Sequence, residues 1–140
     1  MESIKFVVFG EPVAKGRPRF YQRGNFVGTY TPDKTRSAEE VFLLSAIPYK
    51  PKTPFSCALS IDVGIYRPIP KSFSKSKAER AEQRIIRPTT KPDTDNYLKL
   101  ICDALNKVFW NDDSQIVDIC VSKFYSEIPR IKIEIIALEG

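Results

Sequence analysis

The sequence predicts a single α+β domain in which helices pack on one side of a mixed β-sheet. Two observations predict this class. Segments with strand-like alternation and segments with helical spacing of apolar residues follow one another as strand, helix, strand, basic arm, helix, strand, strand. The 140 residues, 42% of them hydrophobic, suffice for one core and are too few for two comfortable domains. We therefore expect one domain over residues 1–140, with a basic, flexible arm at about 71–91.

The strand predictions rest on β-branched and aromatic content and on alternation. Residues 4–9 (IKFVVF) are rich in both residue classes, and apolar residues alternate with polar or small ones over residues 59–66. Residues 116–124 and 130–138 have the same character. The short turn at 127–129 between them predicts that these last two strands form a hairpin.

Two segments have helical spacing. Residues 37–47 predict a short amphipathic helix, and residues 92–109 predict a longer one with two apolar tracks. A helix that is apolar on two faces is either deeply buried or shared with a second subunit. We expect a homodimer and take the second track, Tyr97, Leu100 and Ala104, as its candidate surface.

Composition excludes several classes of chemistry and site. The chain has no histidine, which removes Ser-His-Asp and Cys-His catalysis and histidine-bound zinc. Its cysteines are odd in number and lie among apolar residues, so we expect burial as small hydrophobes: Cys57, Cys102 and Cys120. The N-terminus does not resemble a signal peptide, and no apolar run reaches the length of a membrane span, so we expect a cytoplasmic protein without a membrane partner.

The net charge of +5 conceals an asymmetry along the chain. Residues 1–91 carry 17 Lys/Arg against 8 Asp/Glu, whereas residues 92–140 carry 5 against 9. A basic part beside a locally acidic part suits a protein that attracts a polyanion and holds a cation at the contact. Ordinary solvated surface is the alternative interpretation.

Two segments supply the basic residues that we predict to contact nucleic acid. Residues 13–26 form a loop or irregular hairpin with cations between aromatic rings. The arm at 71–91 has few core candidates; we expect a short helix over 76–84 and mobility elsewhere until a partner binds. The predicted contacts are Lys15, Arg17, Arg19, Arg23, Lys71, Lys75, Lys77, Arg80, Arg84, Arg87 and Lys91. The alternatives are a solvated loop and a solubilising insertion.

Carboxylates gather around the start of the second predicted helix. One capping aspartate would satisfy the helix end, yet Asp93 and Asp95 are both present, and spare oxygens of this kind suit Mg²⁺. Asp95, Lys99 and Asp103 are four residues apart and line one helix edge. A ladder of exposed ion pairs is the alternative. The pair Asp112-Asp113 repels itself unless a cation neutralises it, and it reaches the helix start only if another element or a partner subunit donates it.

Residues 91–123, KPDTDNYLKLICDALNKVFWNDDSQIVDICVSK, resemble the signature of the RusA family of Holliday-junction resolvases. The family pattern is close to (K/R)-P-D-x-D-N-x-x-K-x(3)-D-A-L-(N/T), then D-D-x-Q-(V/I) and a later lysine. The stretch covers about 33 of 140 residues. Lys107 departs from the pattern, since many members carry glycine or another small residue there, but it lies at the helix end and away from the predicted ligands.

The resemblance implies a Mg²⁺-dependent homodimer, with Mn²⁺ as a substitute ion, that nicks four-way DNA junctions symmetrically in recombination and repair. Such enzymes are often encoded by phages and prophages. The family's catalytic, metal-binding aspartates correspond to Asp93, Asp95 and Asp113, and its functional lysine corresponds to Lys99. Other motif positions receive supporting roles: Asn96, Asp103, Asp112, Gln115 and Lys123.

Three other functions remain to be weighed. A restriction-type nuclease would need a D/E-x-K triplet downstream of Asp93, and no convincing one is present. A non-catalytic branched-DNA or RNA-binding module fits the charge but leaves the acids unexplained. A regulatory protein with a decayed site would lack a ligand, and none is missing. The sequence therefore favours the endonuclease.

Overall fold

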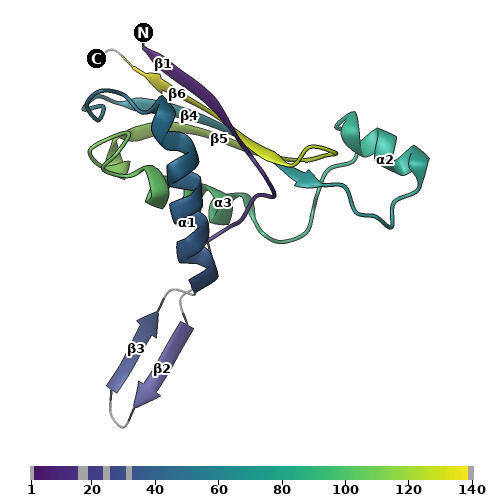
Figure 1. Cartoon of the computed structure of the whole chain (residues 1–140), viewed down its shortest axis with the longest axis horizontal. Helices are drawn as coiled ribbons and strands as arrows, with labels where there is room; N and C mark the ends of the chain where they lie inside the picture. Colours follow the sequence, from purple (N-terminus) through teal and green to yellow (C-terminus); the bar gives the residue numbers. More distant parts are fainter. Residues whose placement is uncertain (1, 16–18, 24–25, 31–32, 139–140) are drawn as a thin grey trace.

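The computed structural model describes residues 2–15, 19–23, 26–30 and 33–138, with side chains described for 2–15 and 37–138. Its elements, in chain order, are β1 (Ser3–Phe9), β2 (Arg19–Arg23), β3 (Phe26–Tyr30), α1 (Asp33–Ala46), the 3-10 turn η1 (Ile47–Tyr49), β4 (Leu59–Pro68), α2 (Lys75–Glu82), α3 (Thr94–Leu105), the 3-10 turn η2 (Asp113–Gln115), β5 (Ile116–Ser126) and β6 (Arg130–Ala137) (Figure 1). No helix of the described chain is long and apolar enough to cross a membrane.

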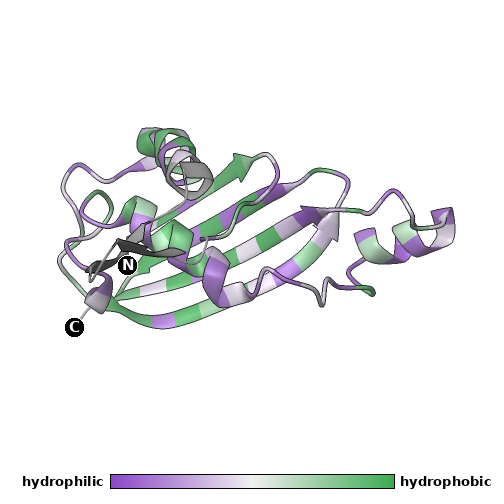
Figure 2. Cartoon of the chain, turned by 90° about the horizontal axis from the view of Figure 1, so that it is seen from below, coloured by the Kyte–Doolittle hydropathy of each residue, from purple (hydrophilic) through white to green (hydrophobic). Residues whose placement is uncertain are grey.

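A mixed four-stranded sheet in the order β1-β6-β4-β5 forms the body of the molecule. β6 pairs antiparallel with both β1 and β4, and β4 pairs parallel with β5, so the first strand lies against the last, with Ser3 opposite Ile136. Hydrophobic and hydrophilic residues alternate along the strands (Figure 2). α1 and α3 cover one face, which confirms the predicted α+β class with a mixed sheet (Figure 1).

The predicted hairpin of the last two strands is wrong. β5 and β6 are antiparallel and joined by a short turn, but β4 lies between them and bonds to both. The turn at 127–129 passes over the end of β4, where Pro68 lies opposite Ser126 and Tyr66 lies opposite Arg130. A short turn sets the relative direction of two strands, but here the burial of the alternating residues of β4 decides which strands are neighbours.

The second apolar track of α3 is buried within the chain, so the predicted dimer surface is wrong. Tyr97 and Leu100 are each 2% exposed and Ala104 is 7% exposed. They belong to the core that α1, α3 and the sheet enclose. The helix is therefore apolar on two faces because its own chain surrounds it.

The helix predicted over 92–109 ends at Leu105, four residues early. Asn106 leaves helical backbone with ψ 138°, and Lys107 completes the turn with φ +70°, in the left-handed region that favours glycine. Phe109 and Trp110 can then fill the core, where both are fully buried. The same geometry explains the small residue that the family pattern favours at this position.

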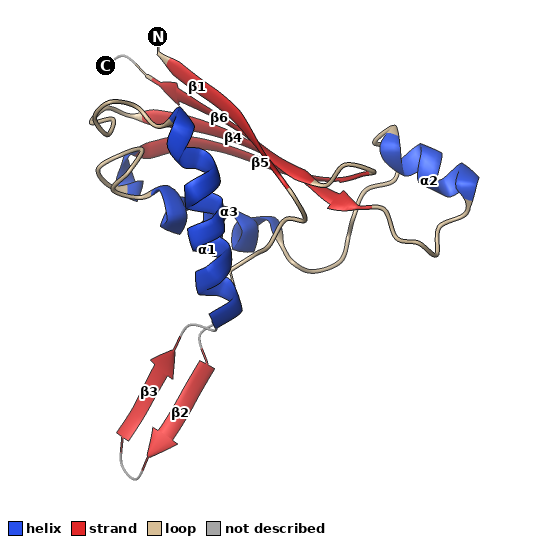
Figure 3. Ribbon diagram, viewed as in Figure 1, coloured by secondary structure: helices blue, strands red, loops and turns tan. Residues whose placement is uncertain are grey.

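Two projections extend from the body (Figure 3). For residues 13–26 a loop or irregular hairpin is predicted; the structure instead has the antiparallel hairpin β2–β3, which pairs Arg19 with Tyr30 and Arg23 with Phe26 and so extends beyond the predicted bounds. α2 confirms the short helix predicted in the arm. The arm packs more than expected, because Phe73 meets the ring of Tyr125 edge-on at 5.5 Å and Ala81 is fully buried. Mobility of the arm without a partner stays a prediction.

All three cysteines are free thiols, and only Cys102 is buried. Cys102 is buried, Cys57 is half-buried and Cys120 is exposed on β5. Burial of Cys120 is therefore a wrong prediction, because its side chain lies with those of Asp62 and Ser122 on the face of the sheet opposite α1 and α3.

We expect Leu105→Ala to lower the free energy of unfolding by about 2–5 kcal/mol, because it leaves a cavity in the packed core. Leu105 is fully buried, whereas Leu44 on α1 is 72% exposed. Leu44→Ala is the matched control and should change stability by less than about 0.5 kcal/mol. Urea denaturation of the two variants measures the difference, and equal effects would contradict the packing described.

Candidate active site

The start of α3 leaves its carboxylates uncommitted to the helix. Asp93 is the N-cap residue, with extended backbone, yet its side chain makes no capping hydrogen bond. Asp95 lies in the first turn, and both side chains are exposed. Two acids therefore stand at the surface at one end of the helix, as the sequence predicts.

Side chains from the sheet hold the segment that leads into α3. The Lys123 ammonium on β5 donates to the carbonyls of Thr90 and Pro92, each at 3.0 Å. Arg67 on β4 also donates to the Thr90 carbonyl at 3.0 Å. Lys123 thus positions the acids by fixing the backbone before them, a contact that the motif alone does not reveal.

The backbone after β1 is attached to the same helix. The Lys15 amide donates to the carbonyl of Asn96 at 3.0 Å. The backbone carbonyl of Asn96 therefore holds the segment that follows β1 beside the start of α3, which is the supporting role that the structure shows for this residue.

A chain of ion pairs runs behind Lys99. Its ammonium lies 3.1 Å from Oδ1 of Asp103, and the other oxygen, Oδ2, lies 2.8 Å from Nζ of Lys15. Lys15 also contacts Glu39 of α1 at 2.6 Å. The inner three side chains are each 22% exposed, whereas Lys99 is 62% exposed. Asp103 therefore anchors Lys99 at the surface and is itself held from behind.

The pKa values of the inner residues reflect this arrangement. Partial burial alone would raise the pKa of Asp103, but hydrogen bonds and charges from Lys15 and Lys99 outweigh it and leave the pKa below its ordinary value. For Lys15, burial lowers the pKa, and the carboxylates of Asp103 and Glu39 outweigh it and raise the pKa. Both residues therefore stay charged at neutral pH.

The turn after α3 gives its acids structural partners. The Asp112 side chain caps η2 by accepting from the Ser114 amide at 2.9 Å, and Gln115 accepts from the Asp112 amide at 2.8 Å. Hydrogen bonds from the Ser114 side chain, and then from its amide, lower the pKa of Asp112. Oδ1 of Asp113 accepts from the Trp110 indole at 2.7 Å. Both carboxylates therefore have hydrogen-bond partners within the chain, and neutralisation of the pair by a cation stays a prediction.

Gln115 connects this turn to the loop before β4. Its amide nitrogen donates to the carbonyls of Phe55 and Cys57 at 2.8 and 3.0 Å. Its supporting role is thus to fix the turn that carries Asp113.

Asp113 is not grouped with Asp93 and Asp95. Within residues 2–15, 19–23, 26–30 and 33–138, no three acidic or cysteine side chains are arranged so that they could hold a metal ion. Burial, followed by the charges of Asp113 and Asp103, raises the pKa of Cys102 to about 12. Asp113 is therefore close enough to Cys102 of α3 for its charge to act on that thiol.

The donor chemistry at the start of α3 fits a hard cation. Mg²⁺ often takes one or two carboxylates, and water and substrate phosphate complete its shell. Asp93 and Asp95 meet that requirement. The third predicted ligand, Asp113, does not join them in a single chain.

The predicted DNA contacts divide into three groups. Those of the arm are all exposed: Lys71, Lys75, Lys77, Arg80, Arg84, Arg87 and Lys91. Lys15 instead lies between two carboxylates, and its contact with DNA stays a prediction. Arg17 and the side chains of Arg19 and Arg23 lie outside the described residues.

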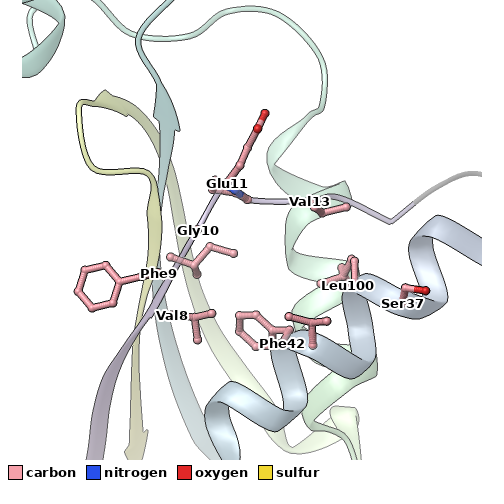
Figure 4. A pocket seen from close by; sticks show the side chains of 12 residues that line it. Val8, Phe9, Gly10, Glu11, Val13, Ser37, Phe42 and Leu100 are labelled. Atoms are coloured by element: carbon pink, nitrogen blue, oxygen red, sulfur yellow. The ribbon is translucent and has the colours of Figure 1, made fainter.

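An apolar hollow of about 290 Å³ lies between β1 and α1 (Figure 4). Val8, Phe42 and Leu100 are among its lining residues, and it contains none of the predicted site residues. The charged groups of the candidate site are instead displayed on the surface of α3, where an extended polymer can reach them.

The exposed acids and lysine of α3, together with the exposed cations of the arm, are typical of the class of proteins that act on a polyanion. A family model described as "Endodeoxyribonuclease RusA" matches residues 10–136. The chain is also 50% identical over 137 residues to "Uncharacterized protein YqaN" of Bacillus subtilis (strain 168), covering 96% of each chain. The chain belongs to the RusA endodeoxyribonuclease family.

We expect Asp103→Asn to lower the free energy of unfolding at pH 7 by on the order of 1–3 kcal/mol, because two charge-assisted hydrogen bonds are lost. A lowered folded-state pKa stabilises the fold above the ordinary carboxyl pKa and ceases to do so as pH falls through the folded value. The gap between wild type and variant should therefore shrink below about pH 4.

Urea denaturation at several pH values measures this gap. Asp118→Asn, an exposed aspartate on β5, is the matched control and should show little change at any pH. A gap for Asp103→Asn that is constant from pH 7 to strongly acid pH would contradict the ion-pair chain.

Proposed function

We propose that this chain is a Mg²⁺-dependent endonuclease that resolves Holliday junctions by paired symmetric nicks in DNA recombination and repair, acting as a cytoplasmic homodimer. Family membership supports nuclease chemistry on DNA. The observation that carries the proposal is the surface of α3, where Asp95 lies one turn and Asp93 about two turns before an exposed lysine held by Asp103.

The residues of the chain have distinct tasks in this proposal. Lys99 contacts the scissile phosphate and stabilises the negative charge that develops on it. Asp103 is a positioning residue, since it touches Lys99 and not the substrate. The exposed cations of the arm bind flanking phosphates, so affinity falls steeply with salt.

The proposed ligands of the metal ion are Asp93, Asp95 and Asp113. The ion, when bound, supplies charge neutralisation and activation of a water molecule. Since no three acids are grouped for a metal ion within the described residues of one chain, this proposal has the set completed on DNA binding or by a second copy of the chain. A homodimer suits the substrate as well, because a four-way junction has near two-fold symmetry and needs two matched nicks.

A non-catalytic module that binds branched DNA or RNA is the second candidate. The separation of Asp113 from the helix start favours it, since a binding protein needs no assembled set of acids. The two candidates differ in one respect that can be measured, which is whether cleavage accompanies binding.

We expect Asp95→Asn to lower junction cleavage by on the order of a hundredfold or more, because residues that merely support a metal ligand already cost about 10- to 100-fold when changed. The assay follows a labelled synthetic four-way junction in Mg²⁺, with Mn²⁺ in parallel, and compares it with matched linear duplex. Junction binding by the variant should remain.

Asp118→Asn is the control for the loss of one carboxylate elsewhere on the surface and should cleave like wild type. Binding by wild type without cleavage in either ion would support the binding module. Equal cleavage by wild type and Asp95→Asn would place the active site elsewhere.

A further inference from the structure

The open face of the sheet, opposite α1 and α3, carries cations packed around two aromatic rings. Tyr66 on β4 and Phe124 on β5 stack with their centroids 5.1 Å apart. A Cβ on Gly64 would lie 3.0 Å from Cε2 of Tyr66, so glycine lets that ring lie over the strand. We call the group the cation–aromatic cluster, and its members are Tyr66, Phe124, Arg84, Arg87, Arg130 and Lys132.

The cations approach the rings from two segments of the chain, the arm and β6. The guanidinium of Arg130 on β6 lies 4.0 Å from the Tyr66 centroid, and that of Arg87 lies 4.3 Å from the Phe124 centroid. Arg84 lies 5.0 Å from Phe124, and Lys132 lies 5.4 Å from Tyr66. All four distances fall within the range of cation–π attraction.

These four cations make no direct ion pair within the described residues: no carboxylate lies within 4.0 Å of them, whereas Lys5, Lys15, Lys99 and Lys107 each have at least one such partner. Arg130 meets an acid only through Ser126, whose hydroxyl accepts from Arg130 at 3.0 Å and donates to the Glu82 carboxylate at 3.1 Å. The acids of the same hollow, Asp62 and Glu134, lie further along the strands, and Glu134 pairs with Lys5. Cation–π contacts at exposed sites give only about 0.5–1 kcal/mol each. Four positive charges gathered at one place favour an anion.

Arg84 links the cluster to the end of α2. Its φ of +67° lies in the left-handed region common just after a helix, and its amide donates to the Ala81 carbonyl at 3.0 Å. The side chain donates to the Tyr66 hydroxyl at 3.2 Å, which keeps the guanidinium charge beside the rings.

The cluster is connected to the candidate active site around the edge of β5. Arg87 donates to the Lys123 carbonyl at 2.9 Å, and the Lys123 side chain turns to the other face to hold Thr90 and Pro92. The segment between Arg87 and Asp93 therefore runs from the cluster to the acids. A ligand bound at the cluster and a phosphate bound at α3 would therefore lie on opposite faces of β5.

We infer that the cation–aromatic cluster binds the sugar–phosphate backbone of one duplex arm of branched DNA while another arm lies at α3. The inference rests on the proposed function and adds Arg130 and Lys132, which the sequence does not single out. Branched DNA suits this placement because its arms leave the branch point in different directions. Binding at the cluster is electrostatic, so it depends on salt and not on base sequence.

The test compares Arg84→Gln/Lys132→Gln with Lys50→Gln/Lys52→Gln in the full-length chain. The control pair is exposed and removes the same charge from the loop before β4, at the other end of that strand. Fluorescence anisotropy measures binding of a labelled four-way junction without Mg²⁺, between about 50 and 200 mM salt. Melting temperatures verify that both variants are folded.

The cluster variant should bind the junction roughly ten- to a hundredfold more weakly at low salt, with a slope of log affinity against log salt smaller by about two. The control should keep the wild-type slope. Lys132→Gln alone should reduce the slope by about one; Lys132 is exposed and donates no hydrogen bond within the described residues, so this variant keeps the fold. Slopes equal to the control for both cluster variants would overturn the inference.

The outcome is separable from that of the proposed function. If wild type nicks the junction in Mg²⁺ and the cluster variants match the control, only the role of the cluster fails. If wild type neither nicks nor prefers junctions, the proposed function fails. In that second case, binding to linear duplex decides the role of the cluster. A smaller salt slope for the cluster variants on linear duplex would show that the cluster binds DNA, and a wild-type slope would show that it does not.

Discussion

The parallel pairing of β4 with β5 is the constraint on which the rest of the structure depends. Parallel neighbours cannot be joined by a tight turn, so the chain must return from one end of the sheet to the other. Residues 69–115 make that return and contain α2, α3 and η2. The predicted metal ligands and the whole basic arm thus lie in one connection whose two ends the sheet fixes.

A small number of polar contacts fix this connection on the sheet. Lys123 holds the carbonyls before α3, Gln115 holds the turn after it, and Arg84 ties the end of α2 to Tyr66. These contacts bond mostly to backbone carbonyls, so they position the chain without using the carboxylates of Asp93 and Asp95. The two carboxylates stay accessible because other residues make the contacts that hold the connection on the sheet.

Local patterns predict most of the fold. The alternation over residues 59–66 and the helical spacing of α3 are short-range features that one buried face imposes, and the structure confirms both. The neighbours of β5 and β6 were not predictable from their turn, because a turn does not specify which strand lies between. The end of α3 depends on the backbone angle of Lys107, which no side-chain pattern encodes.

The site was predictable in its residues and less so in its geometry. The motif identifies Asp93, Asp95 and Lys99, and these lie along one helix as their spacing requires. The capping role of Asp112 had a signal in the sequence, since a glutamine follows it at the third position. The partners Trp110 and Glu39 come from tertiary packing, which a single chain of letters does not reveal.

The pairing of the first strand with the last affects how the protein folds as it is synthesised. β1 has no partner until β6 has left the ribosome, since β6 alone bonds to it. Local helices form in microseconds, whereas pairings between distant segments are slow. The backbone hydrogen-bonding edge of β1 toward β6 therefore stays unpaired through most of translation, and the sheet completes only after the segment carrying the candidate active site has already been made.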